Sequence, residues 1–155
     1  MKKINFLLFL SLLTGCATGS IDILNSKGKI VGQCEIGFDW HWYGLDDSID
    51  YGLNTYCAEW AASKGENLRI ASKSPNKDYS LPEPPAGKSW NRKLAYEQFK
   101  KGNISEQKYG YILAAVEFIY VKKIDIADER LAKGDISLDE HEKILSKERF
   151  VFYGE

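Results

Sequence analysis

The stretch Gly37 to Asp47, GFDWHWYGLDD, places acidic, imidazole and aromatic side chains within eleven residues. Asp39 and His41 stand two positions apart, and a carboxylate that orients an imidazole is the arrangement of a general acid–base pair. No serine or cysteine nucleophile is tied to this pair in the sequence, so we assign no catalytic residue and keep a small enzyme as an alternative. The side chains that suit a ligand platform are Asp39, His41, Tyr43, Asp46 and Asp47.

The element expected to carry this stretch is a β-strand over residues 29–43. Apolar or small residues at its even positions alternate with mostly polar residues at its odd positions, which is the pattern of a half-buried antiparallel strand. Asp39 and His41 then share the exposed face, about 7 Å apart along the strand. Trp40 and Trp42 point into the core. The purely structural interpretation of the stretch is therefore an exposed strand face above a tryptophan-rich core.

The partner of this strand is expected at residues 21–24. The sequence Asn25-Ser26-Lys27-Gly28 between the two apolar runs is typical of a hairpin turn. A β-bulge at Gly32 or Gly37 would reverse the assignment of faces beyond it. Residues 67–73 are expected to return as a third strand.

A helix is expected after the strand, ending at Lys64 before Gly65. Asp46, Asp47 or Ser48 is the expected N-cap, because short polar side chains accept hydrogen bonds from the free amides of the first turn. Its apolar stripe is expected to comprise Ile49, Leu53, Tyr56, Cys57, Trp60 and Ala61.

Two cysteines are expected to form a disulfide. Cys34 lies on the apolar face of the predicted strand and Cys57 on the apolar stripe of the predicted helix, so two independent periodicities direct both thiols to one core. A bridge that closes a loop of this length stabilises a fold by roughly 3 kcal/mol. Two cysteines and two distant histidines are too few for a zinc site, and we expect no metal and no cofactor.

The N-terminus is expected to carry a targeting signal. Basic residues at 2 and 3 precede an apolar run over residues 4–13, which is too short to span a bilayer but fits the core of a signal peptide. The sequence Leu13-Thr14-Gly15-Cys16 follows, and it resembles the lipobox of bacterial lipoproteins. The resemblance implies cleavage after Gly15 and a diacylglyceryl group on Cys16. An ordinary secretory signal is the alternative.

The residue after Cys16 and the net charge of the chain indicate where the protein is located and what it binds. In Gram-negative lipoproteins an aspartate at that position marks retention in the inner membrane, so Ala17 implies the outer membrane, facing the periplasm. Without Lys2 and Lys3 the chain keeps 19 basic and 22 acidic side chains, a net charge of −3. We therefore expect no nucleic-acid partner, and contact with the membrane through the lipid on Cys16.

The C-terminal part is expected to be helical. Residues 74–89 hold all four prolines and form an extended linker. Helices are expected over residues 90–101, 105–133 and 137–150, and the middle segment is either one helix or two that meet near residue 122.

An internal repeat organises these helices. AYEQFKKGNISEQKYGYIL and ADERLAKGDISLDEHEKIL recur at an offset of 32 residues. In each copy a glycine ends one helix, an isoleucine fills the turn and a serine caps the next helix. The pattern resembles the short C-terminal (SHOCT-like) helical module, which implies partner binding or self-association. His141 and Tyr109, at equivalent positions, are expected at a packing seam. Residues 134–140 also match half of an EF-hand loop, but Leu131 and Lys133 cannot coordinate calcium.

The expected fold class is α+β. The expected divisions are a signal peptide (1–15), a tether (16–20), an α+β unit (21–73), the linker (74–89) and a helical repeat unit (90–155). The expected function is an outer-membrane lipoprotein that binds a protein or another envelope component. An immunity or inhibitor lipoprotein that acts on a periplasmic toxin or hydrolase is the main alternative.

Overall fold

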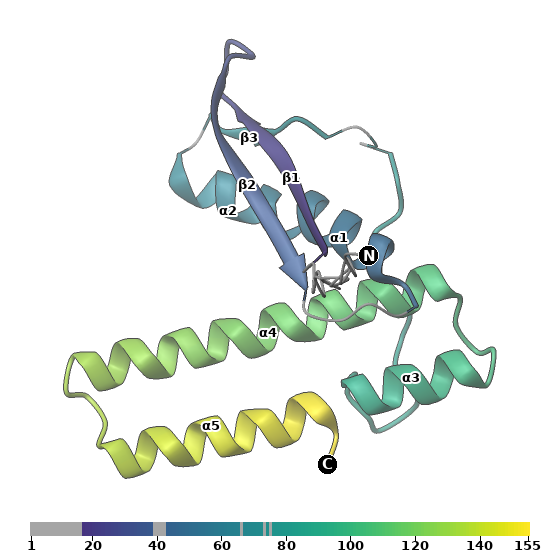
Figure 1. Ribbon diagram of the computed structural model, residues 1–155, viewed down its shortest axis with the longest axis vertical. Helices are drawn as coiled ribbons and strands as arrows, with labels where there is room; N and C mark the ends of the chain where they lie inside the picture. The colour runs from purple at the N-terminus through teal and green to yellow at the C-terminus, as the bar shows by residue number, and fades with distance from the viewer. Residues whose placement is uncertain (1–16, 39–42, 66, 73, 75) are drawn as a thin grey trace, which may run out of the picture.

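The computed structural model describes residues 17–38, 43–65, 67–72, 74 and 76–155, and it confirms the α+β fold. A three-stranded antiparallel sheet in the order β2-β1-β3 packs on α1, and α1 lies across α4 (Figure 1). The strands are β1 (Ala17–Leu24), β2 (Ile30–Phe38) and β3 (Arg69–Ile70). The helices are α1 (Leu45–Asn54), α2 (Tyr56–Lys64), α3 (Arg92–Lys100), α4 (Glu106–Ala132) and α5 (Leu138–Tyr153).

The hairpin between β1 and β2 forms around the predicted turn. The Asn25 side-chain oxygen accepts hydrogen bonds from the amides of Lys27 and Lys29, both at 3.0 Å. β1 starts at Ala17, so residues 17–20, which we predicted as a tether, are part of the sheet. The missing side chain of Gly19 allows this, since a Cβ there would overlap Ile49 of α1.

A bulge lies next to the turn of this hairpin. Ile23 pairs with Gly32 and Leu24 pairs with Ile30, so Val31 is an extra residue in β2. The bulge precedes Gly32, and the faces predicted for the rest of the strand are therefore unaffected.

The predicted alternation holds for the second half of β2. Ile36 and Phe38 are each 5% exposed, while Gln33 and Glu35 face solvent. Ile30, which we predicted on the apolar face, is 55% exposed, because the end of the hairpin extends beyond the helices that cover the sheet.

The predicted disulfide between Cys34 and Cys57 is confirmed. The two Cα atoms lie 5.9 Å apart, and Cys57 is fully buried. The bridge ties β2 to α2. The other main neighbours of α2 are α1 and β3.

The helix predicted before Lys64 is interrupted at Thr55. The Thr55 hydroxyl donates to the Tyr51 carbonyl at 2.6 Å and the Asn54 side-chain amide donates to the Asp50 carbonyl at 2.9 Å, so side chains compete for backbone acceptors in the last turn of α1, just before the break. Along α2, Cys57 and Ala61 are buried as predicted, whereas Trp60 is 39% exposed and Tyr56 is 37% exposed. The N-cap of α1 is Gly44, and none of the three predicted polar residues caps the helix.

The third strand is only two residues long, and the linker contains no helix or strand among its described residues. The middle C-terminal segment, which the sequence left as one helix or two, is the single 27-residue helix α4. No helix in the described part of the chain is both long and apolar enough to cross a membrane.

The two repeats form matching helix–turn–helix connections. Gly102 and Gly134 adopt φ angles of 73° and 77°, which favour glycine. Ser105 caps α4, and Ser137 caps α5 in a complete capping box. Ile136 in the second turn is 8% exposed, as expected for a residue that fills the turn.

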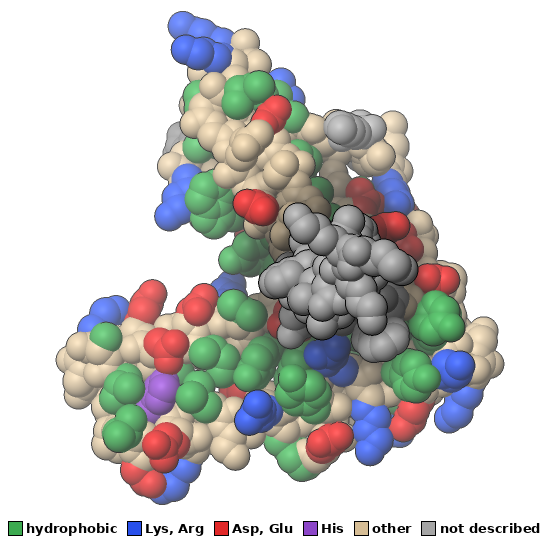
Figure 2. Space-filling model, viewed as in Figure 1, with side chains coloured by type: hydrophobic (Ala, Val, Ile, Leu, Met, Phe, Trp, Pro, Cys, Tyr) green, Lys and Arg blue, Asp and Glu red, His purple; other side chains and the backbone are tan. Residues whose placement is uncertain are grey.

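The main core lies between the sheet, α1 and the first half of α4, where residues 109–116 are buried. The second half of α4 extends beyond the sheet and pairs with α5 to form a helical hairpin (Figure 1). Hydrophobic side chains gather along this hairpin on the face shown in Figure 2.

Candidate functional site

The junction between β2 and α1 is fixed on α4 by two glycines. Gly44 has φ 74°, and a Cβ on it would lie 2.9 Å from Gly110 Cα; a Cβ on Gly110 would overlap the Gly44 carbonyl. The Ser48 hydroxyl lies 2.9 Å from the Gly44 oxygen and 2.8 Å from the Gly110 oxygen, and the Gly44 amide donates to Glu106 Oε1 at 3.0 Å. We call these four residues the glycine seam.

The predicted ligand platform falls on this junction. Asp39 and His41 lie outside the described residues, so the platform and the acid–base pair stay predictions. Tyr43 is 55% exposed and packs against Phe99 of α3, with ring centres 5.4 Å apart. Asp46 and Asp47 are in the first turn of α1, and only Asp47 comes close to a cation.

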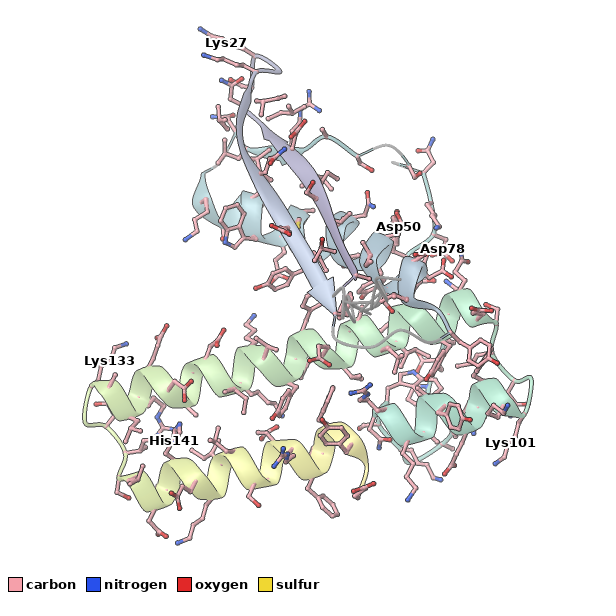
Figure 3. The ribbon with its side chains drawn as sticks, viewed as in Figure 1. Lys27, Asp50, Asp78, Lys101, Lys133 and His141 are labelled. Carbon is pink, nitrogen blue, oxygen red and sulfur yellow. A yellow bond between two sulfur atoms is a disulfide. The ribbon has the colours of Figure 1, made fainter. Side chains whose placement is uncertain are left out.

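That cation is Lys77 of the linker, which organises a polar cluster over α1 and α4. Its Nζ lies 2.7 Å from Asp50 Oδ2 and 4.0 Å from Asp47 Oδ1, and the Tyr79 hydroxyl lies 3.2 Å from Asp50 Oδ2. The Tyr111 ring, 0% exposed, lies beneath, with its centre 5.7 Å from Lys77 Nζ. We call these five residues the lysine cluster; Figure 3 shows Asp50 facing the linker near Asp78.

Electrostatics holds this cluster in one charge state. The hydrogen bond to Asp50 raises the pKa of Lys77. Burial, followed by the nearby Asp50 carboxylate, raises the pKa of Tyr79 to about 12, and burial also raises the pKa of Tyr111. At neutral pH the cluster therefore offers a charged ammonium and two neutral phenols. The Asp50 carboxylate is held by Lys77 and by the Tyr79 hydroxyl, so these contacts attach the linker to α1.

A second lysine completes the attachment of the linker. Lys108 Nζ on α4 lies 2.6 Å from the Ser80 carbonyl oxygen and 3.2 Å from Asp78 Oδ2. Hydrogen bonds from Ser80, followed by the one from Lys108, lower the pKa of Asp78 to about 2. The linker is thus bound to α1 through Lys77 and to α4 through Lys108.

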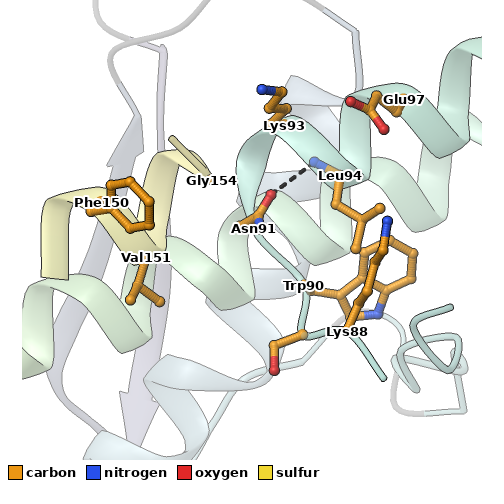
Figure 4. A pocket seen from close by; sticks show the side chains of 10 residues that line it. Lys88, Trp90, Asn91, Lys93, Leu94, Glu97, Phe150, Val151 and Gly154 are labelled. Carbon is orange, nitrogen blue, oxygen red and sulfur yellow. Dashed lines mark hydrogen bonds between the residues drawn. The ribbon is translucent and has the colours of Figure 1, made fainter. Parts of the chain in front are cut away.

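A partly apolar groove lies between the end of the linker, the start of α3 and the end of α5 (Figure 4). Its volume is about 450 Å³. Trp90 and Leu94 line one wall, and Trp90 is held by a 2.8 Å hydrogen bond from its indole nitrogen to the Pro82 carbonyl. Phe150 and Val151 line the other wall and are 65% and 46% exposed. The groove suits binding of an apolar side chain or segment.

Metal ligands do not gather anywhere in the part of the chain that the structure describes, where no three His, Cys, Asp or Glu residues are placed to hold an ion. His141, at its predicted seam, is 9% exposed, and its Nε2 lies 2.6 Å from Asp128 Oδ1. Tyr109, its counterpart in the first repeat, is 8% exposed.

Comparisons with protein-family models, curated proteins and solved structures found no match.

The glycine seam, the lysine cluster and the groove were not predicted from the sequence. An isolated glycine within the apolar run of α4 was an available signal for the seam, since such a glycine marks a close approach of backbones. Lys77 and Tyr79 lie in a segment without periodicity, so no pattern pointed to them. The groove depends on how α3 and α5 meet, which local sequence does not specify.

Replacing Lys77 with glutamine is expected to destabilise the fold by about 1 kcal/mol, because the side chain is about one-third exposed and its ion pair is partly screened. Since folding raises the pKa of Lys77, its stabilisation is complete below the ordinary value of 10.5 and is lost as pH rises through the higher folded-state value. Urea unfolding at neutral pH measures the loss. Lys101→Gln, at an exposed helix end, is the control and is expected to change stability by less than about 0.5 kcal/mol; equal effects of the two variants would contradict this role.

Proposed function

We propose that the protein is a lipoprotein of the outer membrane that faces the periplasm and binds a protein or another envelope component through its helical part. The lipobox-like sequence that ends at Cys16, after a basic and an apolar segment, is the observation that carries the anchoring role. Acyl chains on one residue each add about 0.8 kcal/mol per buried CH₂, which holds a chain of this size at a bilayer.

The position of β1 gives this anchor a structural consequence. β1 begins at Ala17, directly after the cysteine, so the lipid has no spacer between it and the sheet. Ala17 pairs with Phe38 at the end of the sheet nearest α4. A lipid on Cys16 therefore holds the folded unit directly against the membrane surface.

The disulfide supports an exported protein. Bridges such as Cys34–Cys57 persist in the periplasm and are rare where thiols are kept reduced.

The groove at the end of α5 supports the binding role. Large exposed apolar side chains that line a concave surface are typical of sites that contact another molecule. Phe150 and Val151 have this character, whereas Lys77 of the lysine cluster is already paired with Asp50 within the chain. The groove is therefore the surface that we assign to an envelope partner.

Replacing Cys16 with serine is expected to move the protein from the membrane fraction to the soluble periplasm or to leave its signal uncleaved, because serine cannot form the thioether. Fractionation, together with metabolic labelling by a radioactive fatty acid, measures the outcome. The wild-type chain is the labelled control. Label that persists in the serine variant would refute the anchor at this position.

Replacing Val151 with aspartate is expected to abolish envelope adducts that a photo-crosslinker at Lys93 forms in whole cells, since a charge cannot be buried in the groove. The fold should be unchanged, because Val151 is 46% exposed. Ile126→Asp, at a similarly exposed site outside the groove, is the control and should keep the adducts. Adducts that survive in Val151→Asp would show that the groove is not the binding surface.

A further inference from the structure

One side of α5 carries a stripe of residues whose positions are symmetric about its centre. Its members, which we call the palindromic stripe, are Leu138, Glu142, Leu145, Ser146, Arg149 and Tyr153. Their spacing is the same when read from either end of the helix. At 3.6 residues per turn they cover about 100° of the helix surface, which is the width of a packing face.

This stripe is accessible along its length. Leu138 and Tyr153 at its two ends are 63% and 40% exposed, and between them only Leu145 is partly buried against α4. Two shallow hollows, of about 420 and 530 Å³, flank the small side chain of Ser146 on either side of Arg149. The stripe is thus apolar at its ends and hollow near its centre.

The charges in the stripe have no partner within the described part of the chain. Several other charges on α5 are paired: Lys143 lies 2.6 Å from Asp139, and Glu148 lies 2.5 Å from Lys123 of α4. Glu142 and Arg149 form no ion pair or side-chain hydrogen bond with any described residue. They are two turns apart on the helix, about 10 Å, which is too far for them to pair with each other.

We propose that the palindromic stripe is a homodimer interface in which the α5 helices of two copies pack antiparallel across a two-fold axis. A two-fold axis between residues 145 and 146 places Glu142 opposite the partner's Arg149. The symmetry repeats this contact, so the interface contains two such ion pairs. The axis also places Leu145 over the hollow at the partner's Ser146. At each end Leu138 meets the partner's Tyr153, so apolar contacts enclose the ion pairs.

Charge selects this arrangement over a parallel one. A parallel pair would set each charge of the stripe against its own copy, Glu142 against glutamate and Arg149 against arginine, which is repulsive. Lys147, the adjacent basic residue, projects from another side of α5 and takes no part. The interface uses a different side of α5 from Val151 and does not depend on the lipid anchor.

Disulfide capture in the full-length chain tests the axis. Ser146→Cys places a thiol beside the two-fold, and mild oxidation in intact cells is expected to yield a covalent dimer on non-reducing gels. Lys147→Cys is the matched control, one residue along but on another side, and should yield several-fold less dimer. Equal yields from the two variants, or capture of a different protein by Ser146→Cys, would overturn the proposal.

Charge exchange tests the pairing. In the Ser146→Cys chain, Glu142→Arg or Arg149→Glu alone is expected to lower the dimer yield several-fold, because each sets like charges against each other. The two changes together restore opposite charges and should restore the yield. A double variant that dimerises no better than the single variants would also overturn the proposal. Membrane fractionation of the same cells reports on the anchor separately.

Discussion

The backbone of α4 touches the backbone that leads into α1 at Gly110 and Gly44, and most of the architecture follows from that contact. Ser48 bridges the two carbonyl oxygens, and Gly44 donates to Glu106 at the start of α4. Because α1 lies this close to α4, the sheet that α1 carries shares one core with the first half of α4. The N-terminal and C-terminal units therefore pack as one body at this contact.

The same contact explains why surface is left over at the other end of the molecule. α4 is 27 residues long, but the sheet unit covers only its first half. The second half has α5 as its main neighbour, and α5 is covered by α4 and, near its end, by α3. An elongated two-helix hairpin leaves much apolar and charged surface without a partner inside the chain. The proposed binding groove borders this hairpin at the end of α5, and the palindromic stripe lies on α5.

Features with a local cause were predictable from the sequence. The Asn25–Gly28 turn, the two glycine-terminated helix ends and the serine caps follow from the conformations and hydrogen bonds that these residue types favour. The Cys34–Cys57 bridge was predictable because two periodicities agreed.

Features that depend on distant contacts were not predictable. The early start of β1 requires a glycine that accommodates Ile49, and the break at Thr55 results from side chains that compete for backbone acceptors. The order of the linker comes from Lys77 and Lys108, which bind it to two helices far away in sequence. Of the candidate platform, only Tyr43, Asp46 and Asp47 are described, and Tyr43 and Asp47 contact different neighbours.

The stability of Gly110→Ala tests the glycine seam most directly. In an open helix this change is favourable by about 1 kcal/mol. In the seam the added methyl group overlaps the Gly44 carbonyl, so equilibrium urea unfolding should show a net loss of about 1–3 kcal/mol, as in other overpacked sites. Gly32→Ala, where the added methyl group meets nothing within 4 Å, is the control that should leave stability nearly unchanged. A Gly110→Ala chain as stable as the wild type, or more stable, would contradict the close backbone contact between Gly110 and Gly44.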